Sequence, residues 1–181
     1  MTVDEIFGAL SAHFIKGMML HDQMANYYDF LQLRGFKRCH EYHFKAESCS
    51  YRKLNRYYLN HYNKLIPEVR VDDPKVIPEN WYKYSRIDVD MNTKKNAVRN
   101  AMDKWVSWET ETKETLEQMY CELLDLNEIA TAVFIQDFIK DVDCELKWAE
   151  RKQLDLMSVD YDMTYILDKQ DKMHDKFKSM L

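Results

Sequence analysis

A chain of 181 residues is long enough for one domain with a sizeable core and too short to favour two. Its 3 glycines and 3 prolines, set against 26 Lys+Arg and 31 Asp+Glu, favour helices over turn-rich β architectures. The net charge of -5 is mixed along the chain and leaves no basic stripe for phosphates, which excludes nucleic acid from the expected partners.

The N-terminal part of the chain carries two helical patterns. Apolar, aromatic or small residues recur at every third or fourth position from about Val3 to Leu33, and again from about Phe36 to Leu65, which is the spacing of one helix face. Arg34-Gly35 separates the two patterns. Ile66-Pro67 ends the second, because a residue before proline leaves the helical region. The sequence therefore predicts two long antiparallel helices.

The rest of the chain predicts a long connection and three more helices. Residues 67 to 92 contain all three prolines and no helical period, so they have room to cross the molecule. A third helix is expected over about 93 to 125 and a fourth over about 128 to 157, with a short turn near Leu126–Glu128. The last segment, DYDMTYILDKQDKMHDKFKSML, predicts a short amphipathic fifth helix. The expectation is an all-α single domain over residues 1–181, a four-helix bundle with a long crossover between helices two and three.

Several ionisable side chains fall on the inward faces of these helices. Helical spacing places three of them together on the second helix and brings in the others from the first, third and fourth. The candidates are His21, His40, His43, Glu47, Glu109, Asp141 and Glu145. Inward carboxylates without a partner cost several kcal/mol of repulsion and desolvation, so a metal, a trapped proton or a protonated histidine has to neutralise them.

Three helices carry a resemblance to ferritins. The second, KAESCSYRKLNRYYLNHY, resembles the ferritin helix in which an iron-binding Glu is followed three places later by His; here the pair is Glu47 and Ser50. The third, AMDKWVSWETETKETL, resembles the ferritin helix whose seam Glu contacts the irons, with Glu109 at that place. The fourth, FIQDFIKDVDCELKWAE, is similar to the helix that completes the site, with Asp141 and Glu145 at or next to its ligand positions. The crossover PENWYKYSRI and the tail YILDKQDKMHDKF also resemble their ferritin counterparts, so the likeness to the ferritin-like superfamily spans nearly the whole chain.

The departures from the ferritin pattern bear on the metal centre. A di-iron carboxylate site needs about four carboxylates and two imidazoles from four helices. The first-helix Glu of ferritins would fall near Phe14, between His13 and Ile15, and none of these is a carboxylate. Ser50 stands where the imidazole would be. The resemblance therefore implies an altered or incomplete di-metal centre, and ferroxidase activity stays an open question.

Two interpretations of the inward side chains remain open. They form a displaced site of mixed nitrogen and oxygen ligands for iron, manganese or zinc, or the acids are satisfied by hydrogen bonds to tyrosines, histidines and Ser50. A thiolate ligand from Cys49 or Cys144, which lie beside presumed seam acids, is also open.

Three classes of function follow. The first is a ferritin-like protein that binds or stores iron or another first-row metal. The second is a metal-free structural or interaction subunit, and the third is a di-metal oxidase or oxygenase, for which the ligand set is thin. We favour the first, because Glu47, Glu109 and the Asp141/Glu145 pair lie on three separate helices at family-like places. The resemblance also implies assembly into a homo-oligomer.

The expected compartment is the cytoplasm. No apolar run approaches the roughly 20 residues of a bilayer span, and the N-terminus MTVDEIFGALSAHFIKGMML lacks the features of a secretory signal. The cysteines form no CxxC pair and are expected to be reduced thiols. We therefore expect a soluble protein with no membrane partner.

Overall fold

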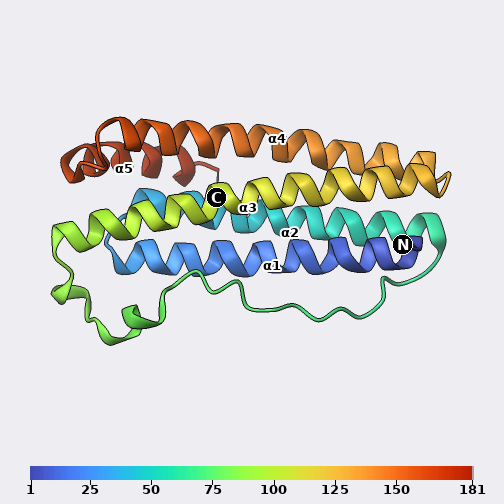
Figure 1. Ribbon diagram of the computed structural model, residues 1–181, viewed down its shortest axis with the longest axis horizontal. Coiled ribbons are helices and arrows are strands. Elements are labelled where there is room, and N and C mark those ends of the chain that lie inside the picture. The colour runs from blue at the N-terminus through green and yellow to red at the C-terminus, as the bar shows by residue number, and fades with distance from the viewer. Residues whose placement is uncertain (181) are drawn as a thin grey trace.

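A computed structural model describes residues 1–180 and shows four long helices packed side by side, with a shorter helix after them (Figure 1). The helices are α1 (Val3–Phe30), α2 (Arg34–Tyr62), α3 (Met91–Asp125), α4 (Ile129–Ser158) and α5 (Met163–Lys178). Two short 3-10 turns, Glu79–Lys83 and Arg86–Asp88, lie in the connection between α2 and α3. The described residues contain no strand, which confirms the predicted all-α class.

Side-chain caps begin three of the helices. Thr2 caps α1 in a capping box, in which its hydroxyl accepts the Glu5 N–H and the Glu5 carboxylate accepts the Thr2 N–H. Asp90 and Asp162 accept backbone N–H groups in the first turns of α3 and α5. Such caps satisfy N–H groups that have no partner within the helix, so the helix starts are encoded locally.

The prediction that Arg34-Gly35 breaks the chain between the first two helices is wrong in its position. The turn lies at residues 31–33, where Gln32 has a positive φ of 63°, and Gly35 belongs to α2. A Cβ on Gly35 would lie 1.9 Å from the carbonyl oxygen of Gln170 on α5. Glycine is therefore required here by the close approach of α5 and not by a turn.

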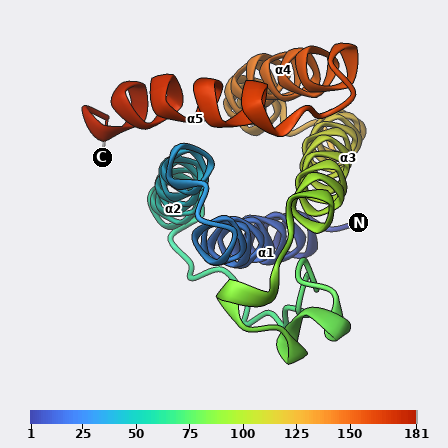
Figure 2. The same cartoon turned by 90° about the vertical axis from the view of Figure 1, so that its left-hand side faces the viewer.

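The helices form two antiparallel pairs, α1 with α2 and α3 with α4, and α5 lies across α2. The view along the bundle shows the four long helices at four corners, with α5 reaching from α4 over α2 (Figure 2). The connection between α2 and α3 runs along α1: Val69 approaches Gly8, and Gln23 bonds Asp73. The predicted long crossover is confirmed, and because it spans the length of the bundle, α2 and α3 run in the same direction (Figure 1).

The core consists of two apolar halves with a polar layer between them. One half surrounds Tyr28, Phe36 and Trp105 near the α5 end, and the other surrounds Phe7 and Leu116 near the N-terminus. The buried histidines and glutamates lie between these halves on α1, α2 and α3. Within residues 1–180, no helix combines the length and the apolar character that crossing a membrane requires.

Candidate metal centre

Three of the predicted site residues come together in the polar layer. His21 on α1, His43 on α2 and Glu109 on α3 offer ligand atoms that all lie within 4.8 Å of one another. Their exposed fractions are 1%, 4% and 1%. His21 Nε2 lies 3.8 Å from Glu109 Oε1. Two imidazoles and one carboxylate facing one another in a dry interior form a donor set that suits a first-row transition metal.

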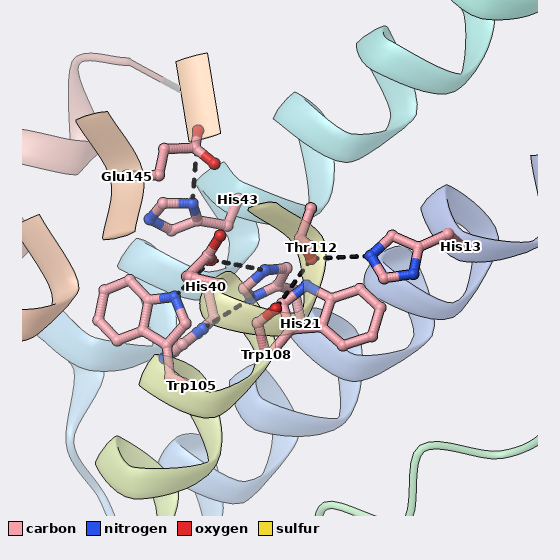
Figure 3. A network of polar contacts seen from close by, with 9 residues as sticks. His13, His21, His40, His43, Trp105, Trp108, Thr112 and Glu145 are labelled. Carbon is pink, nitrogen blue, oxygen red and sulfur yellow. Dashed lines mark hydrogen bonds and ion pairs between the residues drawn. The ribbon is translucent and has the colours of Figure 1, made fainter. Parts of the chain in front are cut away.

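His40 lies against this group and orients His21. The two Nδ1 atoms are 3.0 Å apart (Figure 3), so one of them must carry a proton and the other must accept it. If His21 donates, its Nε2 offers a lone pair on the Glu109 side, and His40 carries its own proton on Nε2. That His40 nitrogen is buried and has no hydrogen-bond partner among the described residues. A cation at His21 Nε2 would select this tautomer, in the way that a second hydrogen bond commonly fixes a metal-binding imidazole.

Glu109 is held by a tryptophan of its own helix. Trp105 Nε1 donates to Glu109 Oε1 at 2.8 Å, one turn away on α3. Burial, followed by the negative charge of Glu145, raises the pKa of Glu109 to about 8, and the Trp105 hydrogen bond opposes the rise. In the absence of a cation the carboxyl is therefore largely protonated near neutral pH, and a metal ion would have to displace that proton.

Glu47 is buried beside the group and faces a glycine. A Cβ on Gly17 would lie 2.6 Å from Glu47 Oε1 and 3.1 Å from the Trp108 ring. The α1 neighbour of Glu47 is therefore Gly17, three positions beyond the Phe14 expected from the sequence, and no carboxylate comes from this point of α1. Burial, then Glu109 and Glu145, raise the pKa of Glu47 well above its usual value. The Trp108 indole N–H lies near enough to the Glu47 carboxyl to oppose this rise in pKa, but its geometry does not complete a hydrogen bond.

Glu145 and Asp141 lie farther out, on α4. Glu145 Oε1 is 3.9 Å from His43 Nδ1 (Figure 3), and its side chain is 31% exposed. Burial and the neighbouring Asp141 raise the pKa of Glu145 to about 7. Asp141 is exposed. Both line a cleft of about 470 Å³ between α2 and α4, together with Glu47. The predicted site residues thus divide into a buried group and an acidic cleft that borders it.

The cleft also contains Cys49, Cys144 and Ser50. All four cysteines of the described chain are unpaired, and Cys49 and Cys144 are exposed. The group formed by His21, His43 and Glu109 includes neither thiol. A thiolate ligand therefore stays a prediction for the cleft alone.

Sequence reasoning missed the aromatic partners of the site. Trp105 lies four residues before Glu109, a spacing that brings side chains of one helix into contact and was the available signal. His13 was not a candidate either. Its Nε2 lies 2.8 Å from Thr112 Oγ1, and its ring stacks on Trp108 (Figure 3). Because the Thr112 hydroxyl donates to the Trp108 carbonyl, it accepts from His13. Thr112 thus provides the hydrogen-bond partner of His13 Nε2, and His13 lies outside the group of His21, His43 and Glu109.

The arrangement of the helices matches a known structure. A solved structure described as a humanized archaeal ferritin superposes on this chain with a TM-score of 0.77, covering 94% of each chain at 15% sequence identity. The chain has the ferritin-like fold. The four-helix bundle with its long crossover and short fifth helix is confirmed as the ferritin-like type. No protein-family model matches the sequence, and no curated protein matches it, so the site has to be argued from the residues of this chain.

A complete di-iron centre does not fit these residues. Gly17 occupies the α1 position that faces Glu47, and Ser50 offers no imidazole. One cation fits His21, His43 and Glu109 better. Ligands held tetrahedrally at about 2.0–2.1 Å from a first-row metal lie roughly 3.4 Å apart. Separations of up to 4.8 Å therefore have to shorten by up to about 1.4 Å to reach this ligand spacing, which small rotations of the three side chains within their rotamer wells would provide.

Proposed function

We propose that this protein binds one first-row transition-metal ion inside its ferritin-like bundle, with iron as the first candidate and manganese or zinc as alternatives. The single observation that carries the proposal is the convergence of His21, His43 and Glu109 from three helices within 4.8 Å. The protein would then be an iron-binding or storage-type protein whose centre is altered from the di-metal arrangement. When bound, the metal would supply Lewis acidity or one-electron chemistry; the protein's part is to hold it in a dry pocket.

The residues around the group have distinct roles in this proposal. His40 orients His21 through the Nδ1 contact, and Trp105 orients Glu109. Glu145 adjoins His43 at the inner end of the α2–α4 cleft. Asp141 and Glu145, which line the cleft, would attract cations into it, because like charges focused in a groove raise the local concentration of counter-ions. The buried Glu47 carboxyl would first have to lose the proton that its raised pKa favours.

A metal-free subunit is the competing proposal. The raised pKa values of Glu47, Glu109 and Glu145 support it, because protons alone can neutralise acids that burial has made weak. In that case the acids are a structural feature of the polar layer. The two proposals differ in one measurable property, which is a stoichiometric metal site.

The test is metal loading of protein that has first been stripped with a chelator. Anaerobic Fe(II), and separately Mn(II) and Zn(II), are added, unbound metal is removed by gel filtration, and metal per chain is measured by mass spectrometry. We expect about one ion per chain. His43→Gln and Glu109→Gln should abolish it, whereas His13→Gln, a change at a buried histidine outside the group, should retain it. Loading unaffected by His43→Gln would contradict the proposal.

We further propose that the protein is a cytoplasmic homo-oligomer. Exposed apolar side chains near the α3–α4 turn support self-association: Ile129 is 60% exposed and Val133 58%, and such groups commonly mark interfaces. The free thiols of the described residues support a reducing compartment. Light scattering coupled to gel filtration would measure the assembly. A monomer would remove mineral storage from the proposal and would leave metal binding in place.

A further inference from the structure

A second cavity lies away from the metal group, where α5 packs against α2 and α4. Its volume is about 200 Å³. Its floor is apolar and includes Phe36 from α2, Leu156 from α4 and Met173 from α5, whose exposed fractions are 2%, 3% and 7%. Trp148 of α4 forms part of the wall. The cavity is therefore bordered by three helices and has an apolar floor.

The rim of this cavity is basic. It carries Lys152 from α4 and three lysines from α5, which are Lys169, Lys172 and Lys176, against the single acid Asp155. Lys152 pairs with Asp155, and Lys172 pairs with Asp168. The three α5 lysines are spaced by three and four residues, so they share one face of the helix.

Two of these ammonium groups have no carboxylate partner. Within residues 1–180, Lys169 and Lys176 make no ion pair; each lies over an aromatic ring instead, Lys169 over Tyr165 at 5.0 Å and Lys176 over Trp148 at 5.2 Å. Like charges on one helix face repel, and cation–π contacts do not cancel positive charge. Asp168, beside the rim, also interacts electrostatically with Lys169. The four lysines against Asp155 and Asp168 still leave the rim with net positive charge beside an apolar floor.

We propose that this cavity binds a small amphipathic organic anion, a short- to medium-chain carboxylate. The apolar body lies on Phe36, Leu156 and Met173, and the carboxylate meets the ammonium groups of Lys169 and Lys176. The volume of about 200 Å³ is below the usual range of about 300–1,000 Å³ for drug-sized ligands, which selects a slender molecule such as hexanoate or octanoate. An inorganic anion would leave the floor uncovered, and an uncharged alcohol would leave the rim charge unpaired.

The cavity and the proposed metal site share no lining residue, although the charge of Lys176 helps to lower the pKa of His43 after the larger effect of burial. None of the candidate metal ligands lines the cavity. The experiment below uses chelator-stripped protein, so the failure of one proposal leaves the other standing.

Calorimetric titration with octanoate, butanoate, octan-1-ol and inorganic phosphate tests the ligand class. We expect one saturable octanoate site per chain. Octanoate should bind at least tenfold more tightly than butanoate, because each buried methylene contributes about fourfold in affinity. Octan-1-ol should bind at least tenfold more weakly than octanoate, and phosphate should not bind measurably. Equal affinities for octanoate and octan-1-ol would overturn the role of the lysines, and phosphate binding as tight as octanoate would overturn the role of the floor.

A second measurement places the ligand. The ¹³C methyl signal of Met173, assigned with Met173→Leu, should shift on octanoate binding, since this side chain is part of the floor. The double variant Lys169→Gln with Lys176→Gln should lose at least tenfold in affinity. Lys140→Gln, a change at an exposed lysine on α4 away from the cavity, should bind as the parent does. The lysine variants change partly or fully exposed side chains, Met173→Leu keeps an apolar side chain at a buried position, and circular dichroism checks the folding of each. An unmoved Met173 signal, or unchanged affinity in the double variant, would refute the proposal.

Discussion

His21 and His40 face each other through their Nδ1 atoms at 3.0 Å in the buried layer between the two halves of the core. This contact couples the tautomer of a proposed ligand to a residue that does not belong to the group of three. We therefore expect the affinity of the proposed metal site to depend on His40, even though His40 need not touch the metal.

Replacing His40 by phenylalanine should keep the metal site and weaken it. The change removes the acceptor that fixes the proton of His21 on Nδ1. Loss of such an orienting partner typically costs about 10- to 100-fold in metal affinity. Competition titrations against a chromophoric chelator would measure this, with His13→Gln as the matched control. Unchanged affinity would show that the contact does not orient His21, and complete loss of stoichiometry would instead make His40 a ligand.

Replacing Glu109 by glutamine should separate stability from metal binding. In chelator-stripped protein the melting temperature of Glu109→Gln should equal or exceed that of the parent, because the neutral amide removes a buried acid beside Glu47 and Glu145 and can still accept from Trp105. Added metal should raise the melting temperature of the parent alone. At a free metal concentration of 100 times Kd, binding adds about 2.7 kcal/mol to the free energy of unfolding. A metal-induced rise of the same size in the variant would exclude Glu109 as a ligand.

Gly8 of α1 and Gly35 of α2 should respond oppositely to alanine. Gly35→Ala would drive a Cβ to 1.9 Å from the Gln170 carbonyl, so α5 must move. We expect a loss of about 1–3 kcal/mol, as for other overpacked sites. At Gly8, the added Cβ would meet Val69 Cγ1 at an ordinary 3.6 Å. Gly8→Ala should therefore stabilise α1 by about 0.5–1 kcal/mol, the helix propensity difference. Urea unfolding would compare them, and a Gly35→Ala variant as stable as the parent would contradict the close approach of α5.

His13 should make the protein sensitive to acid. Burial lowers the pKa of His13 from 6.5 to about 4, so the unfolded chain binds this proton more readily than the folded one. The stability contributed by neutral His13 is fully present above about pH 6.5 and is lost as the pH falls toward 4. The shift corresponds to about 3 kcal/mol at 1.36 kcal/mol per pKa unit. Burial also lowers the pKa of His21, His40 and His43, so these histidines contribute to acid sensitivity in the same direction.

The difference between the parent and His13→Gln isolates the contribution of His13. Between pH 7 and pH 4.5, the free energy of unfolding in urea should fall less steeply in the variant. Parallel pH profiles for the two proteins would show that His13 is not the titrating group.

The sequence alone determined the helices and their order. Caps such as Thr2 and Asp90 act within one turn, and the prolines of the crossover cannot lie in the interior of a helix without breaking its hydrogen bonds. The same periodicity correctly placed His21, His40, His43, Glu47 and Glu109 on buried faces, because a helix of 3.6 residues per turn determines which side chains share a side.

Only the tertiary structure decided which of these side chains meet. A helix can slide along its neighbour by 1.5 Å per residue without changing its buried face, and such a slide separates partners that periodicity treats as equivalent. The observed offset brings His21, His43 and Glu109 together, sets Gly17 opposite Glu47 and leaves Asp141 exposed in the cleft. The docking of α5 likewise makes Gly35 a packing position and forms the lysine-rimmed cavity. Neither feature could be predicted from the sequence, because contacts between residues more than a hundred positions apart leave no local pattern.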